Sequence, residues 1–278
     1  TYSCIPERGS TNAVKTLNKY LVTATDGYTQ DCYYLKADIR NFFVSIDKDI
    51  LYKELEKIVS TKWVLRLLKQ IIYHDCRTNV YIKSPKWKFD MLPDYKSLWN
   101  TDNTKGLPIG NLTSQFFSNV YLNILDQYVK HHWHCKYYCR YVDDFVILDK
   151  DPQKLNEIHK DLTRFLKEQL NLDLHQHKKS INKVKRGIDF VGFVEKPYRR
   201  VMRQKTLKKI FKIVREQKSN PNWYTTKNLE KYKNTINSYL GMLRSTKGYK
   251  LRREICLQSI NLFMSCDKNF TKLKVLNK

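Results

Sequence analysis

Apolar and polar positions in the part of the chain before Pro197 predict short buried strands mixed with amphipathic helices. Residues 33 to 39 form a β-prone run, which predicts a buried strand with Asp38 at its end. Asp47 follows as the expected N-cap of a helix, ahead of apolar residues at helical spacing, which are Ile50, Leu51, Leu55 and Ile58. Residues 111 to 129 predict another helix on the same grounds.

Two β-prone runs enclose a pair of acids within residues 137 to 148, which predicts a hairpin with Asp143 and Asp144 at or beside its turn. A helix is expected to begin at Asp151, and residues 188 to 194 return to strand. Because strands and helices are mixed without a strict strand–helix–strand repeat, we predict an α+β domain. Its sheet should be antiparallel, with helices packed on one face.

Two other parts of the chain depart from this pattern. Residues 81 to 108 carry three prolines, scattered charges and no sustained period, so we expect a long irregular connection with room for a short hairpin. After Pro197 the apolar positions recur at helical spacing, for example at Leu207, Ile210, Phe211 and Val214. We therefore place a domain boundary near Pro197.

The net charge indicates a class of binding partner. The chain has 52 Lys and Arg against 27 Asp and Glu, a formal charge of +25. Residues 175 to 278 hold +21 of this excess, and residues 1 to 174 hold +4. A basic surface that only aids solubility would not explain why the near-neutral part holds the notable acids. We interpret the C-terminal part as a grip for nucleic acid, attached to a domain that performs chemistry.

The composition is that of a folded protein without membrane spans. The apolar fraction is 41%, which is ordinary for a globular chain. No run of about 18 apolar residues occurs, and the first residues contain neither an apolar signal region nor an initiating Met. We expect an intracellular, soluble and N-terminally incomplete chain that does not bind membranes.

Cysteine and histidine usage does not predict disulfides or zinc. The seven cysteines form an odd set in a chain large enough to fold without disulfides, which favours thiols in a reducing compartment. The cluster of His131, His132, His134, Cys135 and Cys139 contains zinc-binding residue types, but its spacing matches no familiar ligand pattern. We interpret it as structural.

The adjacent carboxylates Asp143 and Asp144 lie in an otherwise apolar hairpin, where two ionised acids are costly unless a cation is bound. On this pair alone a solvated turn is the simpler interpretation, since Asp is common in turns. Asp38, a third acid at the end of another buried strand, favours a metal site. Two Mg²⁺ ions about 3.5–4 Å apart would activate an attacking hydroxyl and stabilise a leaving oxygen in phosphoryl transfer.

Five segments, in order along the chain, resemble motifs of reverse transcriptases. Asp38-Ile39-Arg40-Asn41-Phe42-Phe43 resembles the first carboxylate motif, and Tyr141-Val142-Asp143-Asp144 resembles the YxDD box. Between them, residues 106 to 115 resemble the motif that lines the nucleotide and template pocket. Residues 172 to 180 are similar to the lysine motif, and Phe190-Val191-Gly192-Phe193 is similar to the primer-gripping hairpin. A four-letter match would be weak, whereas this ordered set is specific.

One motif narrows the resemblance to the enzymes of diversity-generating retroelements. Most reverse transcriptases have Gln-Gly and end this motif in Ser-Pro, whereas this chain has Ile109-Gly110 and Ser114-Gln115. Residues 96 to 98 and 187 to 190 also resemble that group. The resemblance implies a cytoplasmic enzyme of bacterial, archaeal or phage origin that copies a template-repeat RNA into cDNA with errors at template adenines. It further implies a structured RNA and a small basic accessory variability protein as partners.

The resemblance assigns roles to the acids and their neighbours. Asp38, Asp143 and Asp144 would be the catalytic residues and, with the Ile39 carbonyl, would hold two Mg²⁺ ions, for which Mn²⁺ could substitute. Phe43 would stack under the sugar and leave no room for a 2′-hydroxyl, the group that distinguishes RNA from DNA. Core packing beside Phe42 is the alternative interpretation.

Other motif residues would contact the nucleotide and the primer. Ile109, Gly110 and Gln115 would line the pocket for the incoming dNTP. Lys179 would protonate or neutralise pyrophosphate, or is one more solvated lysine. Gly192 and Phe193 would let the backbone of a DNA or RNA primer approach closely, while an RNA template lies opposite.

The implied fold is the right-hand polymerase type, with an antiparallel palm followed by a helical thumb. We expect residues 1–32 as a remnant of the fingers and the entry to the palm, residues 33–197 as the palm and residues 198–278 as the basic thumb. By the same resemblance, basic fingers strands would precede residues 4 to 9, and we expect this sequence to lack them. The thumb would track a duplex backbone with basic residues set around tyrosines. These are Lys227, Lys231, Lys233, Arg244, Lys247, Arg252 and Arg253.

Three alternatives stay open at this point. A retron-like or abortive-infection reverse transcriptase is disfavoured by Ile109 and Gln115, and a non-catalytic nucleic-acid-binding palm by the intact acids. An RNA-dependent RNA polymerase would more often have Gly before the paired acids and a smaller residue than Phe43.

Overall fold

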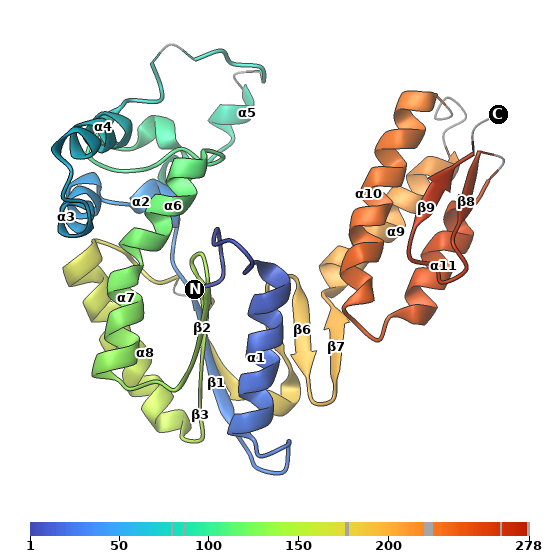
Figure 1. Cartoon of the computed structure of the whole chain (residues 1–278), viewed down its shortest axis with the longest axis horizontal. Coiled ribbons are helices and arrows are strands. Elements are labelled where there is room, and N and C mark those ends of the chain that lie inside the picture. Colours follow the sequence, from blue (N-terminus) through green and yellow to red (C-terminus); the bar gives the residue numbers. More distant parts are fainter. Residues whose placement is uncertain (79, 86, 176–177, 220–224, 262, 277–278) are drawn as a thin grey trace. The chain divides into compact units, whose positions relative to one another are not determined.

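The structure is a computed structural model that describes residues 1–278 except 79, 86, 176–177, 220–224, 262 and 277–278. The chain forms two compact units, Thr1–Lys183 and Val184–Lys278, which we call unit 1 and unit 2 and describe separately. Figure 1 labels their helices and strands.

Unit 1 is built around an antiparallel sheet with the strand order β2-β3-β1-β4. The strands are β1 (Tyr33–Asp38), β2 (Tyr137–Tyr141), β3 (Asp144–Asp149) and β4 (Ser180–Lys183). The predicted strand that ends at Asp38 and the predicted hairpin around Asp143 and Asp144 are both confirmed. The sheet is antiparallel, as expected for an α+β polymerase palm.

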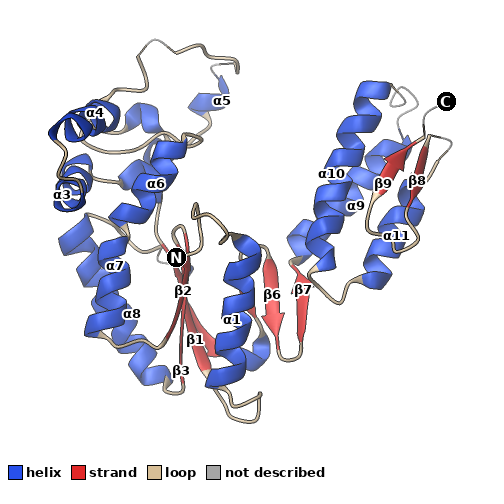
Figure 2. Ribbon diagram, viewed as in Figure 1, coloured by secondary structure: helices blue, strands red, loops and turns tan. Residues whose placement is uncertain are grey.

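Helices cover both faces of this sheet, because the central strands are buried on both sides (Figure 2). On one face, Phe145 and Ile147 pack with the apolar side of α8 (Pro152–Leu170). On the other face, α1 (Ser10–Ala24) packs against β2 and β3, and the Cys139 thiol lies 3.7 Å from the Ala13 carbonyl. The sequence indicated helices on one face, and α1 adds the second layer.

Short-range signals place the remaining helices of unit 1. Asp47 caps α3 (Lys48–Ile58), since its carboxylate accepts hydrogen bonds from the Asp49 and Ile50 amides at 3.0 and 3.1 Å. Asp151 caps α8 in the same way, accepting from the Gln153 amide at 2.7 Å. Unit 1 also contains α2 (Phe42–Ser45), α4 (Lys62–Tyr73), α6 (Leu112–Tyr121), α7 (Asn123–Gln127) and, directly after α7, a π-helical segment over Tyr128–His132.

The connection from 81 to 108 is long and irregular, as predicted. It contains α5 (Trp87–Asp90) and two 3₁₀ turns, Asp94–Lys96 and Leu98–Asn100. Outside residue 86, which is not described, these turns take the place of the short hairpin for which the sequence left room.

Unit 2 starts with a three-stranded antiparallel sheet of β5 (Ile188–Phe190), β6 (Phe193–Lys196) and β7 (Arg199–Met202). The strand expected over 188 to 194 is broken by a two-residue turn, since Val191 and Gly192 both have positive φ, 49° and 86°. In the described part of unit 2, three helices follow, and they bury a shared core. The later elements are α9 (Gln204–Ser219), α10 (Thr226–Arg244), α11 (Tyr249–Ser259), β8 (Met264–Cys266) and β9 (Leu273–Val275).

The compact units meet at Lys183, before the palm–thumb boundary expected near Pro197. The reason is that the β5–β7 sheet belongs to the same unit as the C-terminal helices. The division of labour between palm and thumb at residue 197 stays a prediction. Among the described residues, none of the helices combines the length and apolarity needed to cross a membrane.

Candidate active site

The three acids found in the sequence meet at one end of the unit 1 sheet. Asp38, the last residue of β1, and Asp144, the first residue of β3, are partners in the antiparallel register. Asp143 lies in the tight turn that joins β2 to β3, directly before Asp144. Strand pairing therefore brings together carboxylates from distant parts of the sequence.

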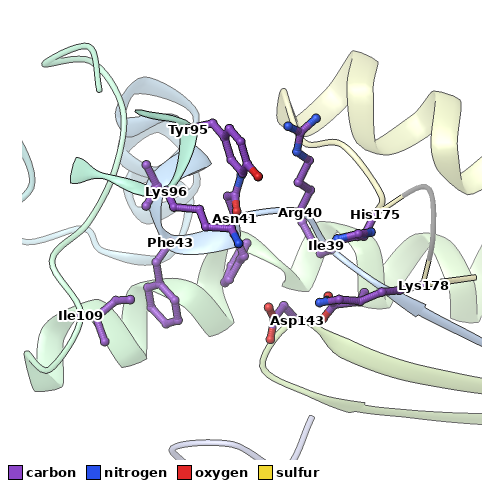
Figure 3. Close-up of a pocket in the computed structure, with 13 residues that line it drawn as sticks. Ile39, Arg40, Asn41, Phe43, Tyr95, Lys96, Ile109, Asp143, His175 and Lys178 are labelled. Carbon is purple, nitrogen blue, oxygen red and sulfur yellow. The ribbon is translucent and has the colours of Figure 1, made fainter. Parts of the chain in front are cut away.

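A pocket of about 650 Å³ opens at this end of the sheet (Figure 3). Five residues predicted for the site line it: Asp38, Ile39, Phe43, Ile109 and Asp143. Its wall also carries cationic and aromatic side chains, which are Arg40, Tyr95, Lys96, His175 and Lys178. The pocket is thus acidic at the strand ends and basic around them.

The three carboxylates are half-buried, and neighbouring cations compensate only part of their charge. Burial raises the pKa of Asp143, and the nearby Asp38 carboxylate adds to the rise. Burial raises the pKa of Asp144 to about 6, although the Lys36 ammonium 3.0 Å away opposes the shift. The Oδ1 atom of Asp144 is buried and has no hydrogen-bond partner in the described part of the chain. A buried acceptor without a donor favours the binding of a cation.

Lysines contact two of these acids. Lys178 forms an ion pair with Asp38, and Lys36 forms one with Asp144. Within the described residues, no three His, Cys, Asp or Glu side chains form a ready-made metal-binding group. The two ammonium groups thus compensate part of the charge of Asp38 and Asp144.

A model of the family described as reverse transcriptase (RNA-dependent DNA polymerase) matches residues 6–194. The match covers more than half of the chain and includes both strands that carry the acids. The chain belongs to the reverse transcriptase family. The family expected from the sequence motifs is confirmed at this level.

Two comparisons relate this chain to known proteins. It is 23% identical over 224 residues to the protein YkfC of Escherichia coli strain K12, a match that covers 69% of this chain and 54% of the relative. Apo telomerase from Candida tropicalis has a similar fold, with a TM-score of 0.52 at 11% identity over 89% of this chain and 44% of that one. The chain thus spans about half the length of the curated relative it matches.

Phe43 takes part both in the core of unit 1 and in the pocket. Its ring centroid lies 5.3 Å from that of Phe42, which is fully buried. Phe43 itself is half-buried and lines the pocket. The sequence offered core packing and nucleotide contact as alternatives, and the position of the ring is compatible with both.

The predicted site residues of the motif at 106 to 115 have different surroundings. Ile109 is 78% exposed and lines the pocket. Gly110 has φ 109°, a conformation that favours glycine. The Gln115 side chain lies outside the pocket lining and accepts a hydrogen bond from the Cys4 thiol at 3.2 Å.

The lysine motif places a different residue in the pocket from the one the sequence singled out. Lys179 lies outside the lining and donates to the Asn156 side chain at 3.0 Å. The preceding residue, Lys178, lines the pocket beside Asp143. Lys178 lies in a turn, where its amide donates to the His175 carbonyl at 3.1 Å, whereas Lys179 has left that turn. The motif alone did not tell these two lysines apart.

Gly192 and Phe193, predicted to contact the primer, lie in unit 2. Gly192 forms part of the β5–β6 turn, and its carbonyl accepts from the Arg203 amide at 3.2 Å. The Phe193 ring is buried, with the Arg200 guanidinium 5.7 Å from its centroid. Backbone rather than the aromatic ring is therefore what this turn exposes.

The sequence did not single out Arg40 and Tyr95 as pocket residues. The Arg40 guanidinium lies 4.7 Å from the centroid of the Tyr95 ring, a cation–π contact between the strand end and the irregular connection. Both side chains are labelled in Figure 3. Because the 81 to 108 segment has no period, nothing in it marks Tyr95 as a neighbour of the acids.

Proposed function

We propose that this reverse transcriptase family member is an RNA-directed DNA polymerase, which extends a DNA or RNA primer with dNTPs along an RNA template. One observation carries the proposal. Asp38, Asp143 and Asp144 converge at one end of an antiparallel sheet, beside a pocket large enough for a nucleotide. The segment that contains them is the segment that matches the family model.

Asp38, Asp143, Asp144 and the Ile39 carbonyl are the groups we propose to hold two Mg²⁺ ions, with Mn²⁺ as a substitute. The donor set fits a hard cation, since it consists of oxygens and includes the unpartnered Oδ1 of Asp144. Bound Mg²⁺ would supply Lewis acidity to the attacking hydroxyl and the leaving oxygen. The raised pKa values of Asp143 and Asp144 reflect burial that a nearby cation would offset.

The pocket walls suggest how the nucleotide is held. Phe43 and Ile109 line the pocket and offer apolar contact to the sugar and base. The Phe43 ring would exclude a 2′-hydroxyl and thereby select dNTPs. Gly110 and Gln115 complete the motif around the template side. Lys178 and Lys179 are the two candidates for neutralising the pyrophosphate that leaves.

Residues 198–278 are proposed to bind the template–primer duplex. This segment lies within the part of the sequence that holds +21 of the net charge. Phosphate contacts by such a surface position a duplex without reading its sequence. Gly192 and Phe193 are proposed to guide the primer strand, with the half-buried backbone turn at Gly192 as the contact.

The finer role follows from the motifs alone. The Ile109-Gly110 and Ser114-Gln115 pairs resemble diversity-generating retroelement enzymes. We therefore propose that the chain copies template-repeat RNA into cDNA with errors at adenines, together with a small basic accessory variability protein.

Sequencing of cDNA made from a defined RNA template tests the whole proposal. The full chain is incubated with primer, template, Mg²⁺ and either dNTPs or rNTPs, with and without an accessory protein. We expect DNA products with substitutions concentrated at template adenines. DNA products with uniform errors would support the polymerase activity and contradict the retroelement role. RNA products would contradict the proposal that the enzyme selects dNTPs.

A further inference from the structure

The turn that carries Asp143 contains a residue in an unfavourable conformation. Val142 has φ 56°, in the left-handed region that β-branched side chains rarely adopt. Tyr141 and Asp144 pair on either side, so Val142 and Asp143 alone make the turn. A backbone of this kind persists only where its surroundings hold it in place.

Arg140 stabilises this turn conformation from inside the protein. Its side chain is fully buried, and its Nη1 donates to the Val142 carbonyl at 2.9 Å. The same guanidinium binds both oxygens of Asp126 on α7, with Nε to Oδ1 at 2.7 Å and Nη2 to Oδ2 at 2.6 Å. The Tyr138 hydroxyl donates to Asp126 Oδ1 at 2.7 Å, which completes the network.

The geometry indicates a role beyond stability for this pair. A buried ion pair is weak support for stability, because desolvation offsets most of the attraction. Here, however, the guanidinium contacts two different elements. Two of its nitrogens fix it to a helix of the core, and the remaining nitrogen fixes the turn. The turn is therefore held in place by a contact with α7 as well as by the hairpin itself.

We infer that Asp126 and Arg140 are positioning residues, which lock the Val142 turn so that the Asp143 and Asp144 carboxylates face the cation site. This inference rests on the proposed function, since it concerns ligands of the proposed Mg²⁺ ions. It assigns the network a measurable effect on metal affinity. Partners that orient metal ligands typically change metal affinity by about 10–100-fold when they are removed.

The test measures metal binding without catalysis. Terbium luminescence, displaced by Mg²⁺, is recorded on the full chain, and the part of the signal lost in Asp143→Asn is assigned to the site. Arg140→Gln and Asp126→Asn should bind Mg²⁺ at least about tenfold more weakly than the original chain. If Arg140→Gln does not fold, Arg140→Lys serves instead, because an ammonium can reach Asp126 but cannot form the three contacts together.

Asp161→Asn is the matched control for Asp126→Asn. Asp161 lies in the same unit and accepts from the Tyr128 hydroxyl at 2.6 Å and the Trp133 indole at 2.8 Å, but it does not contact the turn. Its substitution should lower the melting temperature and leave Mg²⁺ affinity unchanged. Adding Val142→Gly to Arg140→Gln should restore part of the affinity, because glycine adopts positive φ freely.

The outcomes distinguish a failure of the positioning role from a failure of the metal assignment. If Asp126→Asn and Asp161→Asn have the same Mg²⁺ affinity as the original chain, the pair is merely structural and the inference is wrong. If the original chain shows no Mg²⁺-displaceable signal that depends on Asp143, the metal assignment fails and the inference fails with it. Weakened binding only in the Asp126 and Arg140 variants, with rescue by Val142→Gly, supports the positioning role.

Discussion

The ammonium group of Lys178 contacts the carboxylate of Asp38 inside the pocket that also contains Asp143. A lysine thus neutralises one of the three acids proposed to bind metal. Because a cation and an ammonium cannot both occupy the same side of a carboxylate, Lys178 and Mg²⁺ are expected to compete for Asp38.

This competition gives the first prediction. Lys178→Met should bind Mg²⁺ more tightly than the original chain, by at most about fivefold, because exposed ion pairs contribute only about 0.2–1 kcal/mol. Lys178 is 57% exposed in this pair. Lys179→Met is the control, since Lys179 contacts Asn156 instead. Equal Mg²⁺ affinities for the two variants, measured by terbium displacement, would contradict the competition.

The same pair of variants tells the two lysines apart in catalysis. If Lys178 neutralises the leaving pyrophosphate, its loss lowers the rate of extension at saturating Mg²⁺ while Lys179→Met keeps it. The reverse order would return that role to Lys179, as the sequence motif indicated.

Asp143→Asn tests the proposed metal centre directly. Replacing this carboxylate removes a charged ligand from a site that needs several, so primer extension should be abolished while RNA binding is nearly unchanged. Asp149→Asn is a suitable control, because Asp149 ends the same strand β3 and pairs with Lys154 at 2.9 Å. Extension that survives in Asp143→Asn, in an otherwise competent enzyme, would show that the metal assignment is wrong.

The proposed duplex grip predicts a salt dependence. Log affinity for duplex DNA should fall by about 0.9 per neutralised phosphate for each log unit of salt. Lys231 and Arg253 are both exposed. Changing either one to Ala should reduce the slope of log affinity against log salt concentration by about 1. Lys233→Ala should reduce it less, since Lys233 is 24% exposed and pairs with Glu230 at 2.5 Å. An affinity that does not change between low and high salt would argue strongly against this role.

Local patterns were sufficient to predict the elements that carry the acids. The strand ending at Asp38, the cap at Asp47 and the hairpin at Asp143 each follow from a few neighbouring residues, because alternation and capping are short-range effects. The apolar pattern alone did not predict the turn at Val191, since an apolar run looks continuous whether or not the backbone reverses. The resemblance of residues 190–193 to a hairpin motif did indicate a reversal there. The layer formed by α1 was missed because the sequence analysis assigned no helix to residues 10 to 24. Even a predicted helix would not have shown which face of the sheet it covers.

Contacts between distant segments explain why part of the pocket was not predicted. Tyr95 reaches Arg40 from an irregular connection in which no periodic signal exists. Arg140 was visible in the sequence only as a charged residue in an apolar strand, and its partner Asp126 lies on a separate helix. Such pairings depend on tertiary packing, which composition and spacing do not encode.

The last prediction concerns Ile109, where this chain departs from the glutamine that the family usually has. Ile109 lines the pocket and is 78% exposed, so its side chain is free to meet a bound nucleotide. A glutamine there could hydrogen-bond the nucleotide and help to hold it in register with the template base, which isoleucine cannot do. Such a hydrogen bond contributes roughly 0.5–1.5 kcal/mol net, and about 1.4 kcal/mol corresponds to a tenfold change in relative rate.

Ile109→Gln should therefore lower misincorporation by up to about tenfold while extension is retained. The motif resemblance adds that the improvement should be largest opposite template adenine. Leu112→Gln is the matched control, because Leu112 is 79% exposed, lies nearby in sequence and does not line the pocket. It adds the same polar group without offering it to the nucleotide, so its error spectrum should stay that of the original chain. Sequenced cDNA from an active Ile109→Gln enzyme with an unchanged adenine error rate would refute the assignment, because the side chain would then have no part in base selection.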